Sequence, residues 1–142
     1  VARRCLIDQT WRIVLDRWPS DGLLALPRAP VRSITAIRVF DAAGGAVILP
    51  EAAHRLDAVR DPAELILTGA LPLPGRATGG IEIDLVCGFG PAPEDVPAPL
   101  RHAVRLLVAR WYENRGDVMG DAATLPADVA ALVAAVRRPR LA

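Results

Sequence analysis

Apolar and polar side chains alternate in several short stretches before residue 91, as they do in half-buried strands. Residues 9–18 combine β-branched and aromatic side chains with partial alternation, and a turn-forming group follows them at 19–22. Residues 81–87 show the clearest period of two, with Ile or Leu at 81, 83 and 85 and acidic residues at 82 and 84. Because successive side chains of a strand point to opposite faces, both stretches are predicted to be strands.

A β-hairpin is predicted around Ala42-Ala43-Gly44-Gly45, which can adopt the positive φ values of a tight turn. Its strands are residues 31–41 and 46–49. Weaker strands are predicted at 55–59 and 64–67. The short apolar run 23–26 leads into a corner, because Pro27 and Pro30 cannot donate to a central sheet ladder. Residues 71–80 are rich in Pro and Gly and predict a loop.

Helical spacing replaces alternation after Pro97. Leu100, Val104, Leu107, Val108 and Trp111 recur at helical intervals and predict an amphipathic helix, with Arg101, Arg105 and Tyr112 on its other faces. A second helix is predicted after Pro126, where an apolar stripe is formed by Val129, Leu132, Val133 and Val136.

The break from strands to helices predicts an α+β fold, with about 5–7 short antiparallel strands followed by two C-terminal helices. The opening residues 1–8 show no N-cap and no initiator Met, so they are interpreted as the end of a helix that begins upstream. The predicted organisation is a single domain over 1–142. Its parts are the helix end at 1–8, a β-rich region at 9–90, a helical part at 97–137 and a tail at 138–142.

Charge argues against tight binding to DNA. All 17 positive residues are Arg, and 16 acidic residues leave a net charge of +1. Since neutralising phosphates supplies most non-specific affinity for DNA, such a balance favours contact without strong binding. Arg beside Asp and Glu instead suits protein–protein contacts. No apolar stretch is long enough to cross a bilayer, so a soluble protein of the bacterial cytoplasm, with no membrane partner, is expected.

Motifs for catalysis, cofactors or metals are not found in the sequence, so no enzyme activity, cofactor or metal site is predicted. Gly88-Phe89-Gly90 resembles half of a dinucleotide fingerprint, but proline follows it and a turn is expected. His102 is interpreted as a surface histidine rather than a base. Cys5 and Cys87 are expected to be free thiols, since neither lies at ligand spacing from a histidine. The acidic residues Asp57, Asp61 and Glu64 lack the spacing of a calcium loop and are expected in solvated turns.

Two further features leave alternatives open. Trp11, Trp18 and Trp111 either form a stacking platform for single-stranded nucleic acid or pack in the core and at subunit contacts. The basic segment 137–140 is either a solvated terminus or an arm that becomes ordered when it docks on a neighbour.

Several short sequence segments along the chain form a pattern when they are taken together. They are Gln9-Thr10-Trp11-Arg12, the corner 26–31 leading to Ser33-Ile34, Val86-Cys87-Gly88-Phe89-Gly90, Val96-Pro97 through 106–108 to Trp111-Tyr112-Glu113-Asn114-Arg115, and Leu125-Pro126 with Val129 and Leu132. Taken in this order, they resemble the head-tail connector (adaptor) family of tailed phages, prophages and gene transfer agents. The resemblance covers nearly the whole chain.

The resemblance implies a structural subunit of a ring of about twelve copies in the neck of a virion or phage-like particle. Such a ring joins the portal to a stopper or tail-completion protein and lets DNA pass without sequence-specific binding. By the same likeness, 9–90 is a β-rich insertion and 97–137 forms the ring. Family members usually carry further helices before the position of Val1, and Cys87 stands where they often have a small residue.

Interface residues follow from the resemblance together with the helical pattern. On the main helix they are Arg101, Arg105, Trp111, Tyr112 and Arg115, and in the tail they are Arg137, Arg138 and Arg140. Three rival functions remain: a stopper or tail-completion protein, which would lack the helical half; a small-molecule-binding or hydrolytic α+β domain, which needs a deep pocket; and a nucleic-acid-binding module, whose affinity would fall with salt.

Overall fold

A computed structural model describes residues 4–113 and 125–136, and within them it has the predicted α+β order. The elements are β1 (Gln9–Leu15), β2 (Leu23–Ala25), β3 (Val31–Phe40), β4 (Ala46–Ile48), the 3-10 helix η1 (Glu51–Ala53), β5 (His54–Asp57), β6 (Glu64–Leu67), β7 (Ile81–Cys87), the 3-10 helix η2 (Pro93–Asp95), α1 (Ala98–Glu113) and α2 (Ala127–Ala135). The predicted loop at 71–80 contains no helix or strand.

Residue contacts divide the chain into two compact units. One unit spans Arg3–Pro91 and holds all the strands of the described residues, and the other holds the segment from Ala92 onward with both α-helices. The interpretation of residues 1–142 as one connector domain stays a prediction.

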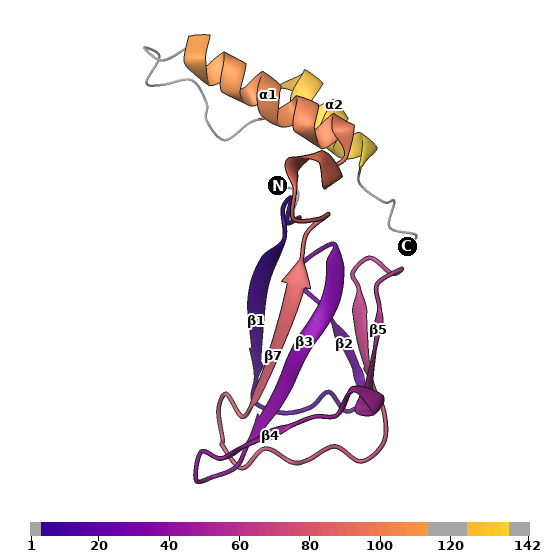
Figure 1. The fold of residues 1–142 in the computed structure, drawn as a ribbon, viewed down its shortest axis with the longest axis vertical. Helices are drawn as coiled ribbons and strands as arrows, with labels where there is room; N and C mark the ends of the chain where they lie inside the picture. The colour runs from indigo at the N-terminus through magenta and orange to yellow at the C-terminus, as the bar shows by residue number, and fades with distance from the viewer. Residues whose placement is uncertain (1–3, 114–124, 137–142) are drawn as a thin grey trace. The chain divides into compact units, whose positions relative to one another are not determined.

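The β-unit contains a four-stranded sheet in the order β1-β7-β3-β4 and a three-stranded sheet in the order β2-β6-β5. All the strand pairs are antiparallel (Figure 1). The predicted hairpin is confirmed, since β3 pairs with β4 from Arg38–Ile48 to Phe40–Ala46. Pairing of β7 with both β1 and β3 makes it a central strand, although all three are far apart in sequence.

The core of this unit is built from the alternating residues of β7. Ile81, Ile83 and Leu85 are fully buried, and Ile37 of β3 and Leu65 of β6 are fully buried with them. Each such side chain contributes about 1.5–3 kcal/mol through removal from water. The period-two pattern therefore predicted the core face of the central strand correctly.

The other face of the same strands holds a buried charge. Asp84 of β7 is 9% exposed and lies between Arg12 of β1 and Arg38 of β3. Its carboxylate accepts hydrogen bonds from Arg12 Nε at 2.7 Å and from Arg38 Nη1 at 2.5 Å. Glu82 adds a second ion pair with Arg12 at 3.1 Å. The three strands are thus linked across their polar face by charge-assisted hydrogen bonds.

The prediction of a helix end at 1–8 is wrong for the residues described, 4–8. Arg4 forms a parallel bridge with Ala29, and the Cys5 amide donates to the Ala29 carbonyl at 2.9 Å. The Asp8 amide donates to the Gly90 carbonyl at 3.0 Å. This segment therefore obtains its backbone partners from distant segments rather than from its own turns. A short apolar run cannot distinguish these two cases by its period.

Candidate assembly interface

Helix α1 carries an apolar arc wider than its neighbour covers. Leu100 and Ala103 are buried and Leu107 is half-buried. By contrast, the side chains of Val104, Val108, Trp111 and Tyr112 are 45%, 56%, 68% and 66% exposed. We call these four residues the outer stripe. The single apolar face predicted for this helix is therefore divided into a covered part and an uncovered part.

The second helix predicted from the sequence is present as α2. Helix α2 contacts α1 and contributes the buried Val129 together with half-buried Leu132, Val133 and Val136. Proline sets the start of each helix: the Pro97 carbonyl accepts from the Leu100 amide at 2.9 Å, and the Pro126 carbonyl from the Ala130 amide at 2.8 Å. Helix α2, with 9 residues against 16 in α1, leaves the outer stripe uncovered.

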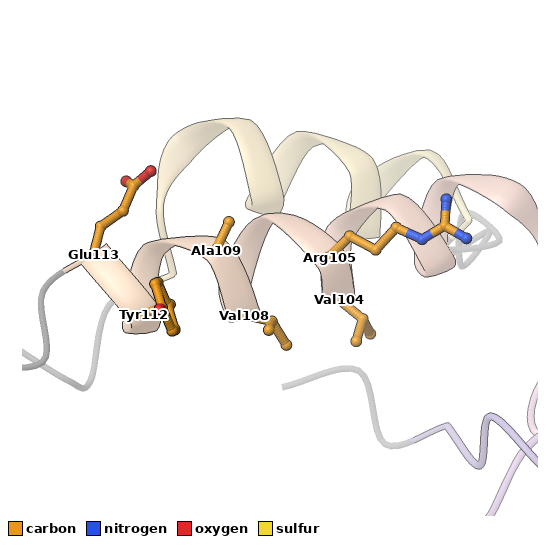
Figure 2. A pocket seen from close by; sticks show the side chains of 6 residues that line it. All are labelled: Val104, Arg105, Val108, Ala109, Tyr112 and Glu113. Carbon is orange, nitrogen blue, oxygen red and sulfur yellow. The ribbon is translucent and has the colours of Figure 1, made fainter.

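Along the outer stripe, α1 forms one wall of a shallow groove of about 410 Å³. The residues that line it are Val104, Arg105, Val108, Ala109, Tyr112 and Glu113. Figure 2 shows Val104, Val108 and Tyr112 in a row along one side of α1, as the four-residue spacing requires. Tyr112 was predicted to lie off the apolar stripe, and the structure corrects this.

Charged groups flank the outer stripe. Arg105 and Glu113 line the groove eight positions apart on the helix, so it has a positive and a negative end. Arg101 is half-buried, and its Nε is buried with no hydrogen-bond partner within the described part of the chain. A buried donor without a partner costs about 1–3 kcal/mol.

The predicted interface residues divide between described and undescribed segments. Arg101, Arg105, Trp111 and Tyr112 all lie on α1, and three of them are exposed. Arg115 and the tail residues Arg137, Arg138 and Arg140 lie outside the described residues. The sequence signal missed the exposure of Val104 and Val108, because helical spacing alone does not reveal how much of an arc a neighbour covers.

Two of the three tryptophans are held by tertiary contacts in the β-unit. Arg28 stacks on the ring of Trp11 at 4.0 Å, and Trp18 Nε1 donates to the Pro72 carbonyl at 2.8 Å. Both rings pack against the hydrophobic core. Of the two interpretations, packing rather than a stacking platform applies to Trp11 and Trp18. Trp111 remains available for an intermolecular contact.

A second groove, of about 800 Å³, lies in the β-unit between β3 and the segment 48–58. Glu51, His54 and Arg55 supply polar side chains to its wall. Within the described residues no hydrogen bond joins Glu51 to His54, and His54 Nδ1 is buried without a partner. The Arg32 guanidinium, also in the wall, is bound by Asp8. Glu51 and His54 are therefore not joined as an acid–base pair in the described part of the chain.

The acidic residues singled out in the sequence are bound by arginines rather than left in solvated turns. Asp61 pairs with Arg4 at 2.8 Å, and Arg60 pairs with Asp57 and Glu64 at 3.3 and 2.6 Å. Among residues 4–113 and 125–136, no three metal-ligating side chains gather into a possible metal site. His102 is exposed on α1. In the same ranges, no helix has the length and apolar character required to span a membrane.

Comparison with known proteins gives relatives among solved structures. No protein-family model and no curated protein sequence matches the chain. A chain in the neck of a native gene transfer agent particle, computed with C12 symmetry, is 35% identical with a TM-score of 0.77, and the match covers 99% of this chain and 75% of that one. A chain in the virion of a native gene transfer agent particle is 32% identical with a TM-score of 0.79, over 99% and 71% of the two chains. A chain in the neck of an empty particle, computed with C6 symmetry, is 35% identical with a TM-score of 0.77, over 99% and 71%.

Proposed function

This chain belongs to the family of structural proteins of the gene transfer agent neck, and from that premise we propose that it is the adaptor subunit of such a neck. In this role it forms a ring that joins the portal of a DNA-filled head to the tail-side stopper. The observation that carries the proposal is the outer stripe of α1, an uncovered apolar surface on a chain whose relative lies in a neck of C12 symmetry. The role requires no bond-making chemistry.

A ring of identical copies needs two different complementary surfaces on each subunit, because heterologous contacts repeat around the axis until they close. The outer stripe supplies one surface, with Arg105 at one end of its groove and Glu113 at the other. A neighbouring subunit is proposed to cover Val104, Val108 and Tyr112. Trp111 is the side chain that such a contact would bury most, and aromatic anchors of this kind dominate interface energies.

The portal is proposed to contact the helical unit and the tail. Arg115, Arg137, Arg138 and Arg140 supply positive charge for that contact. The β-unit is left for tail-side partners. The overall charge of +1 supports a channel through which DNA passes without adhering, since strong phosphate neutralisation would hold it. A purified ring that bound duplex DNA tightly at physiological salt would contradict this part.

A stopper or tail-completion role is the alternative within the neck. The two α-helices that follow the β-unit support the adaptor over it. A ligand-binding or hydrolytic function would use the 800 Å³ groove beside β3. In the described part of the chain no hydrogen bond joins Glu51 to His54 in its wall, which argues against hydrolysis in this groove.

The test is electron microscopy of the purified chain mixed with portal rings. The expected result is an added ring on the tail side of the portal. Val108→Glu, which places a carboxylate in the middle of the outer stripe, should abolish the added ring while leaving the fold intact. Leu73→Glu is the matched control, because Leu73 is 88% exposed in the loop before β7 and lies outside the helical unit. Binding to a stopper ring and not to the portal would favour the alternative.

A further inference from the structure

The β1-β7-β3-β4 sheet ends in two free edges, β1 and β4. β1 is seven residues long and pairs with β7 in continuous register from Gln9–Cys87 to Leu15–Ile81. It contains no proline or glycine and shows no bulge. Figure 1 shows β1 at the margin of the sheet, and no described strand pairs with its other side. A regular, unprotected edge is a template for another strand.

The direction of the free backbone groups on β1 follows from the printed hydrogen bonds. The Phe40 amide donates to the Gly80 carbonyl, and the Gly88 amide donates to the Pro30 carbonyl, so the even-numbered residues of β7 face β3. Its odd-numbered residues then face β1, and residues 9, 11, 13 and 15 of β1 are their partners. Because backbone groups alternate in direction along a strand, the N–H and C=O of Thr10, Arg12 and Val14 point outward from the sheet.

The opposite edge has matching chemistry. The Leu49 amide donates to the Ile37 carbonyl at 2.9 Å and Val47 pairs with Val39, so Ala46 and Ile48 direct their backbone groups outward. The β4 strand carries no charged side chain, and Val47 and Ile48 are 56% and 67% exposed on opposite faces. Such an edge has none of the charges that normally discourage pairing with another strand.

Other free edges in the β-unit are blunted. β2 and β5 are only three and four residues long. The part of β3 that β4 leaves uncovered has two register irregularities, at Val31/Ser33 and Ile34/Ala36, and bulges twist an edge away from partners. The β1 edge is longer than these and regular, and the β4 edge, although also three residues long, carries only exposed apolar side chains and no charge.

We propose that β1 of one copy pairs with β4 of the next copy in the ring, so that the sheet continues from subunit to subunit. The inference rests on the proposed ring. The direction of the strands favours it: four antiparallel strands alternate, so β4 of a following copy that continues the sheet runs antiparallel to β1. The exposed Val14 and Ile48 lie on the same face of the sheet, and the proposed register places them as cross-strand neighbours.

Pairing of β1 with β1 of another copy is disfavoured. Arg12 is the middle residue of β1, so the register with the greatest overlap places two Arg12 side chains opposite each other, and like charges in that position destabilise a sheet. Such a pair would also be two-fold and closed, whereas a cyclic ring needs a heterologous contact. Since β4 has only three residues, the contact adds to the helical interface and does not hold two free subunits together.

Cysteine cross-linking between subunits tests the proposed pairing of β1 with β4. Val14→Cys and Ile48→Cys are introduced together, and the assembled particles or portal-bound rings are treated with a short bis-maleimide. The native thiols do not interfere, because Cys5 and Cys87 are 6% and 0% exposed. The expected result is a ladder of covalent multimers from the double variant on a denaturing gel, while each single variant stays monomeric.

Three outcomes would overturn the pairing. Rings that form normally but give no ladder show that these edges do not meet, although the adaptor role survives. Dimers from Val14→Cys alone show that β1 pairs with β1. If electron microscopy finds no rings at all, the proposed function fails together with the pairing. As an independent measure, Ile48→Lys should raise the concentration at which rings dissociate severalfold, whereas Leu73→Lys should not.

Discussion

Arg12 lies directly opposite Asp84 across the β1–β7 ladder, and its Nε donates a 2.7 Å hydrogen bond to Asp84 Oδ1. Arg38 reaches the other carboxylate oxygen from β3. One nearly buried carboxylate thus connects three strands and separates two guanidinium groups.

Replacement of Asp84 by Asn should lower the free energy of unfolding by about 2–3 kcal/mol, because three charge-assisted hydrogen bonds are lost or weakened and the two arginines are left facing each other. Urea denaturation followed by circular dichroism measures the change. Glu82→Gln is the control on the same face, since Glu82 makes a single ion pair among the described residues, with Arg12. It should cost less than about 1 kcal/mol. Equal losses in both variants would contradict the central role of Asp84.

Stability should also fall in acid in a defined range. Hydrogen bonds from Arg12 and then from Arg38 lower the pKa of Asp84 from 3.8 to about 2. Because the pKa is lower in the folded state, the ionised carboxylate stabilises the fold above the unfolded pKa, and this contribution disappears as the pH falls toward 2. The loss should be about 2 kcal/mol. Urea titrations at pH values from 5 to 2 should show a steeper decline in the free energy of unfolding for the wild type than for Asp84→Asn. Parallel curves would contradict this role of the Asp84 carboxylate.

The two thiols should be unreactive in the folded protein. Burial, followed by the nearby Cys5, raises the pKa of the Cys87 thiol to about 11, so almost no thiolate exists at pH 8. Iodoacetamide should therefore modify neither cysteine in native buffer and both in urea, as read by mass spectrometry. Val47→Cys, at an exposed position, is the positive control. Rapid alkylation of Cys87 in native buffer would show that this end of the core opens.

Trp111→Ala should separate stability from assembly. The Trp111 side chain is 68% exposed, so its loss should change the free energy of unfolding of the isolated chain by less than about 0.5 kcal/mol. Ring formation on the portal, counted by electron microscopy, should fall sharply. Trp18→Ala is the contrast, because Trp18 packs on the core and should cost about 3 kcal/mol. Normal rings from Trp111→Ala would remove this residue from the interface.

Gly88 should not tolerate a side chain. Its φ is +153°, and a Cβ added there would lie 2.5 Å from the Asp8 amide nitrogen. Gly88→Ala should therefore cost more than about 2 kcal/mol, through backbone strain and displacement of the segment before β1. Gly69→Ala isolates the strain alone, because Gly69 also has positive φ but no atom within 4 Å of the added Cβ. Thermal denaturation should show a larger drop for Gly88→Ala.

The sequence by itself determined the elements of this protein. Alternation at 81–87 identified a strand and its apolar face, and the Gly44-Gly45 turn identified the β3–β4 hairpin. Helical spacing after Pro97 and Pro126 located α1 and α2. These features succeed because each depends on residues a few positions apart, whose periods of 2 and 3.6 are fixed by backbone geometry.

The tertiary structure decided what those elements touch. The contacts of Asp84 join positions 72 and 46 residues apart, and no local period encodes such a choice. Residues 4–8 are predicted from the sequence to end a helix. In the structure, the amides of Cys5 and Asp8 donate instead to the carbonyls of Ala29 and Gly90. The exposure of Val104 and Val108 depends on which side of α1 the other helix packs against, which is a property of the pair and not of α1 alone. Burial depends on how much surface another element covers, and only the packed chain fixes that quantity.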